Sequence, residues 1–476
     1  MQKKTKIIAT IGPASIDYGI LKKMIEQGMN IARINTAHGS YEQYELIINN
    51  LDKIKKELNI KVPILLDVKG PEIRIISNKE YKLNYKDRIK IYFSSNFYKK
   101  NFEKKDFKKM PYFNHKFKPK KGNKILINDG LNELEIIKVN PDNLELKALM
   151  PLIINNKLRI NIPGNYYDAE ILTENDKKVI LNFKNRFDFL ALSYVRNKKD
   201  LSYVRDFLKK NNIDCKIVSK IENIEAVKNF DEILEYSDAI MVARGDLGVE
   251  LPSEKVPLIQ KEIIKKCNQK GKAVITATQM LQTMVNYPIP TRAETSDVAN
   301  SILDGTDAIM LSAESASGKY PIESIKEMTK IAKEVEPYVE SKVNYEIKKE
   351  KNDKINYISQ AISKSISEIT NLINIKKVIA LTHTGFTAKM LSRYKLKQPI
   401  YALCDEKTEP ELILYYGVMP FVVDKIDYIY LKKFIQNLVK ENKLLKEDLI
   451  LVAYGQEKQE TNLIEVNYVD YYLKNN

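Results

Sequence analysis

Short apolar runs alternate with stretches of helical periodicity over roughly the first 340 residues. Eight of these runs are nearly continuous in apolar residues, and they span 5–12, 30–35, 62–70, 187–195, 215–222, 238–246, 273–281 and 307–315. Apolar residues recur with the 3.6-residue spacing of amphipathic helices at 18–28, 41–58, 174–185, 197–211, 223–236, 254–270, 294–304 and 322–340. Strands buried on both faces and separated by helices predict a parallel sheet covered by helices.

The number of strand–helix units predicts a closed ring. Eight units are what a (β/α)8 TIM barrel requires, so this α/β fold is the prediction for the first part of the chain. A doubly wound open sheet is the alternative, but it needs sheet edges that this pattern does not supply. Thr173 and Asn197 each precede a polar first turn and are expected to be helix N-caps.

One long interruption breaks this rhythm between Gly70 and Thr173. Its pattern is short strands and lysine-rich turns, as in YKLNYKDRIKIYF (81–93) and KILINDGLNELEIIKV (124–139). A segment inserted after the third strand emerges at the carboxyl end of the barrel, where barrel enzymes carry their sites. We therefore expect a small β-rich lid, with a decorative insertion as the alternative.

The last third of the chain forms a further unit. The charged run NYEIKKEKNDK (344–354) is typical of a linker, and strand and helix patterns alternate after it. We predict a C-terminal α/β domain with a parallel sheet. The expected organisation is a catalytic barrel (1–70 and 165–342), a β-rich lid (71–164) and an α/β regulatory domain (343–476).

Composition excludes several classes of protein. The net charge is +16, but lysines are spread along the whole chain and arginine is scarce, which argues against nucleic acid as a partner and suits anionic small molecules. No apolar run approaches the roughly 20 residues of a membrane helix. The N-terminus lacks a signal-peptide pattern, so we expect a cytoplasmic protein without a membrane partner. Three scattered cysteines predict neither disulfides nor a zinc site.

Polar side chains gather at the predicted carboxyl ends of the barrel strands. They are Arg33, Asn35, Asp67, Lys69, Glu72, Arg74, Lys220, Glu222, Arg244, Asp246, Thr276, Thr278 and Gln279, and Gly245 between two of them leaves backbone N–H groups accessible for a substrate carboxylate. Buried charges are costly unless they are paired or bind a metal, so core packing does not explain this convergence. Paired carboxylates suit a hard divalent cation, and neighbouring cations suit a phosphorylated substrate that the cation bridges. The pattern indicates phosphoryl transfer, which needs positioning and positive charge more than covalent help.

Each of these residues has a simpler interpretation when it is taken alone. Lys220 and Glu222 are compatible with a structural ion pair, Thr278 with a hydrogen-bonded barrel hydroxyl, and Arg33 with a helix cap. Their joint position at one end of eight strands favours a common site.

The stretch KIVSKIENIEAV (216–227) closely resembles the signature of pyruvate kinases. Further motifs follow in that family's order: TKIIATIGPAS, MNIARINTAHGSYE, LLDVKGPEIR, ILINDG, NIPG, MVARGDLGVE, ATQMLQTM and PTRAETSDVANSILDGTDAIMLSAESASGKYP. The resemblance covers about 1–80, 122–341 and, more loosely, 376–465. It implies a (β/α)8 barrel, a small β-barrel lid and a regulatory α/β domain. It also implies transfer of a phosphoryl group from phosphoenolpyruvate to ADP in the last step of glycolysis, giving pyruvate and ATP, with Mg²⁺ (or Mn²⁺) and K⁺.

The resemblance also implies roles for single residues. Lys220 matches the lysine that stabilises the transferring phosphoryl group and the enolate. Glu222 and Asp246 match the Mg²⁺ ligands, and Gly245 and Asp246 match backbone contacts to the substrate carboxylate. Arg33 matches the arginine that binds the substrate phosphate.

Further implied residues concern the proton and the nucleotide. Thr278 matches the threonine beside the enolate, near the proton delivered to its methyl carbon. Asp129 matches a lid aspartate that closes over the site. The implied nucleotide contacts are Asn35, His38, Arg74 and Lys157.

The monovalent-cation site departs from the family pattern. Its implied ligands are Asn35, residue 37, Asp67 and the carbonyl of residue 68. Ala37 stands where the family has serine, so one side-chain oxygen is missing, and Val68 still offers a carbonyl. Glu72 is the residue type of K⁺-dependent members. We expect a weakened K⁺ site and a raised K⁺ requirement.

The C-terminal domain departs as well. The loop THTGFT (382–387) resembles an effector phosphate loop, although GQEKQETN (455–462) lacks the glycine-rich approach of members that respond to fructose bisphosphate. The candidate effector ligands are Thr382, Thr384, Gly385 and Thr387. The resemblance further implies a homotetramer.

Two other functions are compatible with parts of the pattern. An inactive pyruvate kinase-like scaffold or binding protein is supported by Ala37. A barrel aldolase acting on enolates would share the metal and carboxylate logic, but it does not explain Lys220, Arg74 and the lid together.

Overall fold

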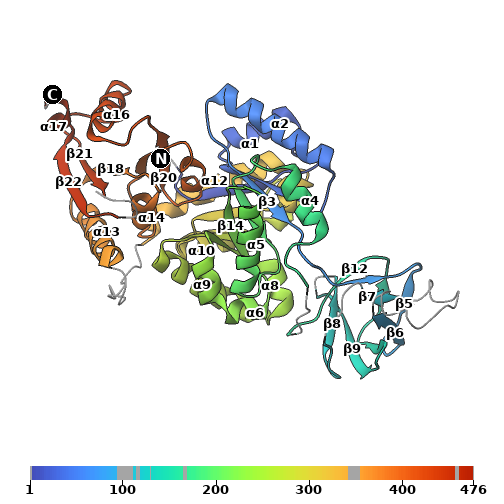
Figure 1. Ribbon diagram of the computed structural model, residues 1–476. Helices are drawn as coiled ribbons and strands as arrows, with labels where there is room; N and C mark the ends of the chain where they lie inside the picture. Colours follow the sequence, from blue (N-terminus) through green and yellow to red (C-terminus); the bar gives the residue numbers. More distant parts are fainter. Residues whose placement is uncertain are drawn as a thin grey trace.

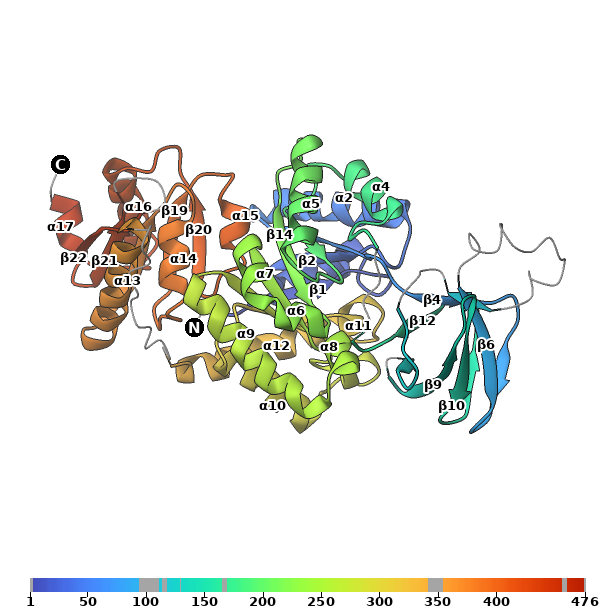
Figure 2. The same ribbon diagram turned by 60° about the horizontal axis from the view of Figure 1, so that its bottom comes forward.

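Three bodies lie in a row in the computed structural model, which describes residues 3–93, 111–113, 118–128, 130–164, 169–340, 354–455 and 460–474. A large barrel occupies the middle, a small β-barrel projects from one end of it, and a five-stranded sheet with helices packs at the other (Figures 1 and 2). None of the helices in the described ranges is long and apolar enough to cross a membrane.

The large barrel is closed by eight parallel strands, as predicted. In spatial order the ring runs β1, β17, β16, β15, β14, β13, β3 and β2, and then returns to β1. The strands in chain order are β1 (Lys6–Thr10), β2 (Ile31–Asn35), β3 (Ile64–Val68), β13 (Phe189–Leu192), β14 (Lys216–Ile221), β15 (Ala239–Ala243), β16 (Ala273–Ala277) and β17 (Ala308–Leu311). Side chains such as Leu65, Phe189 and Met310 fill the interior, so the barrel is a packed core rather than a pore.

Helices surround this ring because their apolar faces need a partner. They are α1 (Tyr18–Glu26), α2 (Tyr41–Leu58), α4 (Glu174–Asn182), α5 (Lys198–Lys210), α6 (Ile224–Lys228), α7 (Phe230–Tyr236), α8 (Arg244–Glu250), α9 (Val256–Lys270), α10 (Arg292–Leu303), α11 (Ala313–Ala316) and α12 (Pro321–Val335). Short 3₁₀ turns lie at Ser253–Lys255, Gln282–Val285 and Glu336–Tyr338. The predicted N-caps are confirmed, since Thr173 accepts from the Asp176 amide and Asn197 from the Lys199 and Asp200 amides.

Several sequence-based element boundaries were wrong, of which two serve as examples. The stretch 223–236 forms two helices separated at Asn229, which adopts a non-helical backbone between α6 and α7. The predicted strand 238–246 ends at Ala243, and the residues after it begin α8. In the second case the apolar run stops where the chain leaves the core, so Gly245 and Asp246 lie in the first turn of a helix rather than on a strand.

The inserted segment forms a second closed barrel. Its strands run in the order β10, β6, β7, β4, β12, β8 and β9, while β11 and β5 form a separate pair. Their bounds are β4 (Arg74–Ile76), β5 (Tyr81–Leu83), β6 (Arg88–Phe93), β7 (Tyr112–Phe113), β8 (Lys124–Ile127), β9 (Asn132–Val139), β10 (Asn143–Ala148), β11 (Leu152–Ile154) and β12 (Leu158–Asn161). Buried aliphatic side chains and Phe113 give it a core of its own.

A tight turn joins β3 to this small barrel. Gly70 has φ of +67°, and a Cβ there would lie 3.0 Å from the Ser193 carbonyl oxygen, so glycine is required. The buried carboxylate of Asp176 accepts hydrogen bonds from the amides of Lys69 and Gly70 at 3.2 Å each. The start of α4 therefore fixes the point where the chain leaves the large barrel.

The C-terminal domain is an α/β sheet in the order β20, β19, β18, β21 and β22. Four strands are parallel as predicted, but β22 pairs antiparallel with β21, so the sheet is mixed at one edge. The elements are α13 (Lys354–Leu372), β18 (Ile375–Leu381), α14 (Phe386–Ser392), β19 (Ile400–Cys404), α15 (Glu409–Leu412), β20 (Val418–Val422), α16 (Tyr428–Lys440), β21 (Leu449–Tyr454), β22 (Leu463–Tyr468) and α17 (Val469–Lys474).

A buried ion pair joins this domain to the amino end of the large barrel. The Lys395 ammonium donates to one oxygen of Asp307 at 2.7 Å, and both side chains are almost fully buried. The same oxygen accepts from the Tyr416 amide at 3.0 Å, and the second oxygen accepts from the Val274 amide at 3.0 Å. Burial lowers the pKa of Lys395 although Asp307 opposes this effect. The C-terminal domain and the lid thus occupy opposite ends of the barrel.

Lys395→Met is predicted to destabilise the protein by about 3–5 kcal/mol, because it leaves the Asp307 carboxylate buried and unpaired. A matched control is Lys407→Met, which removes the exposed pair Lys407–Asp214 (2.6 Å) between the same two domains and should cost less than about 1 kcal/mol. Urea denaturation of both variants measures the difference, and equal losses would contradict the assigned role of the buried pair.

Candidate active site

Lys220 lies at the centre of a buried charge cluster at the carboxyl end of the barrel. Its ammonium is 2.8 Å from Glu222 and 3.3 Å from Asp67, and it donates to the Ser193 hydroxyl at 2.7 Å. These residues come from β14, from β3 and from the loop after β13, which are neighbours in the ring. An ammonium has three donors, and all three are used here.

Paired charges keep Lys220 and Asp67 ionised. Burial alone lowers the pKa of Lys220, but the carboxylates of Asp67 and Glu222 outweigh this effect and raise the pKa above its ordinary value. Burial alone raises the pKa of Asp67, but Lys220 and Arg33 together lower it. Both groups therefore carry their charges at neutral pH, so the cluster presents fixed electrostatics to a ligand.

Arg33 completes the cluster from β2. Its Nε donates to Asp67 Oδ2 at 2.8 Å, and its Nη1 donates to Thr10 Oγ1 at 2.6 Å. It also lines a cavity of about 520 Å³ together with Asn35 and His38. The structure thus brings the predicted substrate-phosphate arginine and two of the predicted nucleotide residues to one cavity.

Asp246 stands beside this cluster on the first turn of α8. Its carboxylate is close enough to raise the pKa of Glu222, which burial also raises while Lys220 opposes both. Arg159 of the lid forms an ion pair with Asp246, with Nη2 2.5 Å from Oδ1. Sequence reasoning missed Arg159, because nothing in the lid pattern indicates which strand approaches the barrel.

Thr278 follows β16 in a strained backbone conformation. Its φ is +68° and that of Gln279 is +52°, a region that a β-branched residue rarely adopts. Arg244 holds this turn by donating to the Thr278 carbonyl at 2.8 Å and the Gln279 carbonyl at 3.1 Å. The Thr278 hydroxyl accepts from the Gly245 amide at 2.7 Å, so the two predicted site residues are in contact. Strain of this kind clusters at functional sites.

The predicted nucleotide-phosphate residues lie on the lid. Arg74 pairs with Glu72 and donates to the Lys157 carbonyl at 2.6 Å. The Lys157 side chain is exposed, and its backbone φ of +58° places it before β12 rather than within the strand. Arg74 and Lys157 are therefore adjacent, whereas His38 and Asn35 face the separate cavity in the barrel.

The predicted K⁺ ligands are partly used by the protein itself. The Asn35 side-chain oxygen accepts from the Ala37 amide at 3.1 Å, and the Val68 carbonyl accepts from the Ser193 hydroxyl at 2.9 Å. Asp67 is shared between Arg33 and Lys220. With no hydroxyl at position 37, the structure leaves this set short of one side-chain oxygen.

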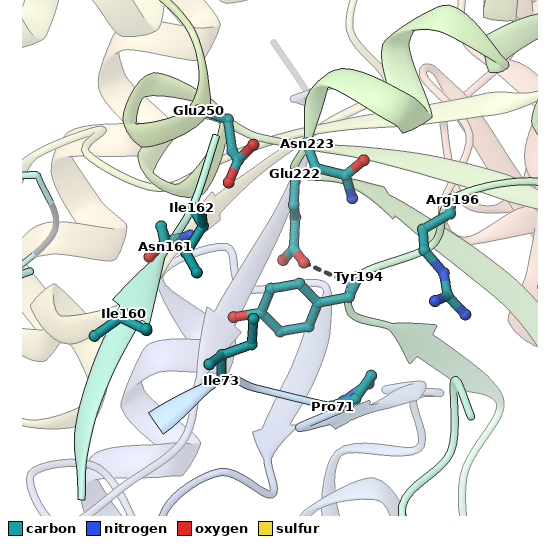
Figure 3. Close-up of a pocket in the computed structure, with 10 residues that line it drawn as sticks. All are labelled: Pro71, Ile73, Ile160, Asn161, Ile162, Tyr194, Arg196, Glu222, Asn223 and Glu250. Carbon is teal, nitrogen blue, oxygen red and sulfur yellow. Dashed lines mark hydrogen bonds between the residues drawn. The ribbon is translucent and has the colours of Figure 1, made fainter. Parts of the chain in front are cut away.

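Tyr194 lines a pocket beside the charge cluster, which Figure 3 shows in close-up with Glu222 and Glu250 around it. Its amide donates to Glu222 at 2.8 Å, and its ring lies between Glu222 and Ile73 (Figure 3). Burial raises the pKa of its hydroxyl well above the ordinary value, so Tyr194 stays neutral. Its φ of +61° is a second strained position. A tyrosine after the apolar run of β13 was a usable signal that sequence reasoning passed over, as was Ser193 before it.

The predicted effector loop begins α14. Gly385 has φ of +77°, Thr382 is buried, and the buried Thr387 hydroxyl accepts from the Thr461 hydroxyl at 3.0 Å. Lys389 donates to the Thr384 carbonyl at 3.4 Å. The two predicted loops therefore approach each other at Thr387 and Thr461. Residues 456–459 of the second loop, and the lid residue Asp129, lie outside the described residues.

Glu222 and Asp246 suit a divalent cation. Within the described part of the chain, no group of three or more Asp, Glu, His or Cys side chains could hold a metal, so the acidic donors here are a pair. The two carboxylates repel each other, and a cation between them would neutralise this repulsion. Asp246 already contacts the guanidinium of Arg159. Such a pair of oxygen donors suits Mg²⁺, which keeps its other coordination sites for waters and substrate oxygens. Fold and site together define a barrel enzyme for anionic substrates.

Comparisons with known proteins identify this class more closely. The family model for the pyruvate kinase barrel domain matches residues 2–325, and that for the pyruvate kinase alpha/beta domain matches residues 360–467. Similar proteins include pyruvate kinases from Sporosarcina psychrophila (40% identical, covering 98% of this chain and 80% of the relative) and from Eimeria tenella (37%, 98% and 90%). A crystal structure of a pyruvate kinase from Cryptosporidium parvum superposes with a TM-score of 0.87 at 32% identity, covering 98% of this chain and 96% of that one.

The chain belongs to the pyruvate kinase family. The predictions of family, fold class, function and phosphotransferase activity are thereby confirmed. The family uses phosphoenolpyruvate and ADP, yields pyruvate, and employs a divalent cation and K⁺. Roles of single residues in this chain remain predictions.

Glu250→Gln is predicted to change how stability depends on pH. Burial raises the pKa of Glu250 from 4.5 to about 7, while hydrogen bonds from Asn161 and the Gly164 amide oppose this shift. The folded state therefore holds a proton that the unfolded state has released, and this contribution, up to about 3 kcal/mol, disappears as pH rises from about 4.5 through 7. Between pH 5 and pH 8, the urea concentration at the unfolding midpoint should fall more in the natural protein than in the variant. Parallel changes would contradict the shift.

Proposed function

We propose that the cluster around Lys220 transfers the phosphoryl group of phosphoenolpyruvate to ADP in this chain. One observation carries this assignment: an ammonium, two carboxylates and a guanidinium from β14, β3 and β2 converge at one end of the ring. The bond from phosphorus to the enol oxygen breaks, and a new bond forms to a terminal oxygen of ADP. The leaving group is the enolate of pyruvate.

Lys220 and Arg33 supply the positive charge for this step. The transferring group spreads negative charge over its oxygens, and fixed cations in a water-poor pocket stabilise that charge. Every donor of Lys220 is engaged by protein acceptors, so a ligand must replace at least one of them. Glu222 is the partner that would release the ammonium, because it is also the residue expected to hold the divalent cation.

The divalent cation, Mg²⁺ or Mn²⁺, would be held by Glu222 and Asp246. When bound, it supplies charge compensation between the substrate oxygens and the transferring group. The amides of Gly245 and Asp246 are proposed contacts for the substrate carboxylate. The Gly245 amide donates to the Thr278 hydroxyl, and a substrate carboxylate at this position would replace that hydrogen bond.

The enolate must then gain a proton on its methylene carbon. Thr278 is the proposed neighbour of that carbon, and its strained backbone is held by Arg244. A hydroxyl positioned in this way can orient the water or side chain from which the proton comes. One C–H bond forms, and pyruvate leaves as the keto acid.

ADP is proposed to bind between the lid and the barrel. Arg74 and Lys157 would contact the phosphates, while His38 and Asn35 lie in the cavity suited to the rest of the nucleotide. Closure of the small barrel over the ring would exclude water, which protects the transferring group from hydrolysis.

We propose that Ala37 raises the K⁺ concentration that the protein needs. Asn35, Asp67 and the Val68 carbonyl remain as ligands, and the missing hydroxyl lowers affinity without abolishing the site. K⁺ would then stimulate turnover at concentrations above those a complete ligand set needs.

Three further features extend this proposal. The domain limits are the barrel at 1–70 and 165–342, the lid at 71–164 and the regulatory domain at 343–476. A phosphorylated effector would bind at the loop of Thr382, Thr384, Gly385 and Thr387. The assembly is a homotetramer in the cytoplasm, and light scattering measures its size.

Lys220→Met should lower kcat by about 10²–10³, because it removes charge stabilisation in the transition state. A pyruvate assay with phosphoenolpyruvate, ADP and Mg²⁺ measures the loss, and circular dichroism checks the fold. Lys220→Arg keeps the charge of the cluster and serves as the comparison. Turnover near that of the natural protein in Lys220→Met would refute the role, and an inactive natural protein would favour the scaffold alternative.

Ala37→Ser should lower the K⁺ concentration for half-maximal activity by about tenfold, because it restores an oxygen ligand worth roughly one hydrogen bond to a charged group. The assay is repeated across a K⁺ titration at constant ionic strength. Ala37→Gly, which adds no oxygen, is the control. A natural protein whose rate is equal without K⁺ and at saturating K⁺ would contradict the proposed site.

A further inference from the structure

Two lid arginines lie side by side and face the barrel. Arg159 of β12 and Arg74 of β4 are directly opposite in an antiparallel pair, so their side chains leave the same face of the sheet. Like charges in this position repel each other and destabilise a sheet. An anion must lie near both for the arrangement to be favourable.

Glu72 provides that anion only in part. Its Oε2 pairs with Arg74 and lies 3.2 Å from the Lys69 ammonium, while its Oε1 lies 3.9 Å from Arg159 Nε. One carboxylate therefore faces three cations. Glu72 alone therefore cannot balance this group of cations, and a further anion is needed beside Arg74 and Arg159.

Arg159 obtains its close anion from the other body. Its Nη2 reaches Asp246, and its guanidinium lies 5.8 Å from the centre of the Tyr194 ring. Among the described residues, its buried Nε finds no hydrogen-bond partner. The Arg159 side chain thus bridges lid and barrel, and its Nε makes no hydrogen bond. It contacts the Asp246 carboxylate, which the proposed function assigns to a divalent cation.

We propose that Arg159 is a nucleotide-phosphate residue that exchanges partners during the reaction cycle. In this structure its guanidinium pairs with Asp246. When Asp246 holds the divalent cation, the guanidinium leaves that carboxylate and, beside Arg74, binds the phosphate chain of ADP. This inference rests on the proposed function, since it takes Asp246 as the metal ligand and ADP as the phosphate compound.

The physical basis is competition for one carboxylate. A guanidinium and a divalent cation cannot both use the same oxygen of Asp246 at full strength, and the released guanidinium finds Glu72 already engaged by two other cations. Phosphate oxygens match the planar donor fork of arginine. Cation and nucleotide therefore assist each other, because each removes the need for the Arg159–Asp246 pair, and this coupling is reciprocal.

The first measurement is Mn²⁺ binding without nucleotide, followed by electron paramagnetic resonance. Arg159→Gln removes the competitor and should bind Mn²⁺ about three- to tenfold more tightly than the natural protein. Arg88→Gln, which changes an exposed arginine elsewhere on the same lid, should bind within about twofold of it. An unchanged or weaker affinity in Arg159→Gln would overturn the competition.

The second measurement is turnover at saturating Mn²⁺. Arg159→Gln should raise KM for ADP about tenfold and leave KM for phosphoenolpyruvate within about twofold. A merely structural role would move both constants or neither, and that outcome would overturn the phosphate contact. Adding ADP should tighten Mn²⁺ binding in the natural protein more than in Arg159→Gln; equal tightening would overturn the coupling.

Arg159→Lys guards against misfolding of the first variant, which circular dichroism would reveal. Lysine keeps the charge at Asp246 but lacks the planar fork, so Mn²⁺ affinity should stay near that of the natural protein while KM for ADP rises severalfold. An unchanged KM for ADP in Arg159→Lys would overturn the proposal. A natural protein that makes no pyruvate would refute the proposed function. The competition at Asp246 would still be tested, because Mn²⁺ binding is measured without turnover.

Discussion

The buried carboxylate of Asp67 is the interaction on which the site depends. One of its oxygens binds Arg33 from the neighbouring strand β2, and the other faces Lys220, which reaches across the mouth of the ring from β14. The two cations would repel each other in a poorly hydrated pocket if this acid were absent. Ser193 fills the space between, where β13 separates β3 from β14. The geometry of the ring thus places Asp67, Arg33 and Lys220 so that their buried charges compensate one another.

Charge also explains why lid and barrel belong to one site. The barrel contributes acids at Glu222 and Asp246, the lid contributes cations at Arg74 and Arg159, and the ion pair between Arg159 and Asp246 joins the two bodies. Strain at Thr278 and Tyr194 is tolerated because neighbouring groups, Arg244 and Glu222, hold these backbones in place.

The sequence predicted the ring because a ring of this kind follows local patterns, and the structure brings the predicted residues Arg33, Lys220 and Glu222 together around Asp67 at one end of it. The helix at 41–58 has the predicted bounds, since Ser40 caps its start and Asn59 ends it in a left-handed conformation. Arg159 could not be found in this way. Motif matching selected Lys157, whose left-handed backbone turns it outward, while the contact between Arg159 and Asp246 joins residues 87 positions apart. Such long-range electrostatics leave no periodic trace in the chain.

The lid leaves the ring after β3 and the chain re-enters it at β13, and these two strands are hydrogen-bonded neighbours, with Val68 opposite Leu192. The inserted barrel has its own apolar core and interrupts no strand pairing of the ring. Because β3 and β13 are neighbours, the chain leaves the ring and returns to it at adjacent points. A change in the length or sequence of this segment would therefore leave the strand register of the ring as it is.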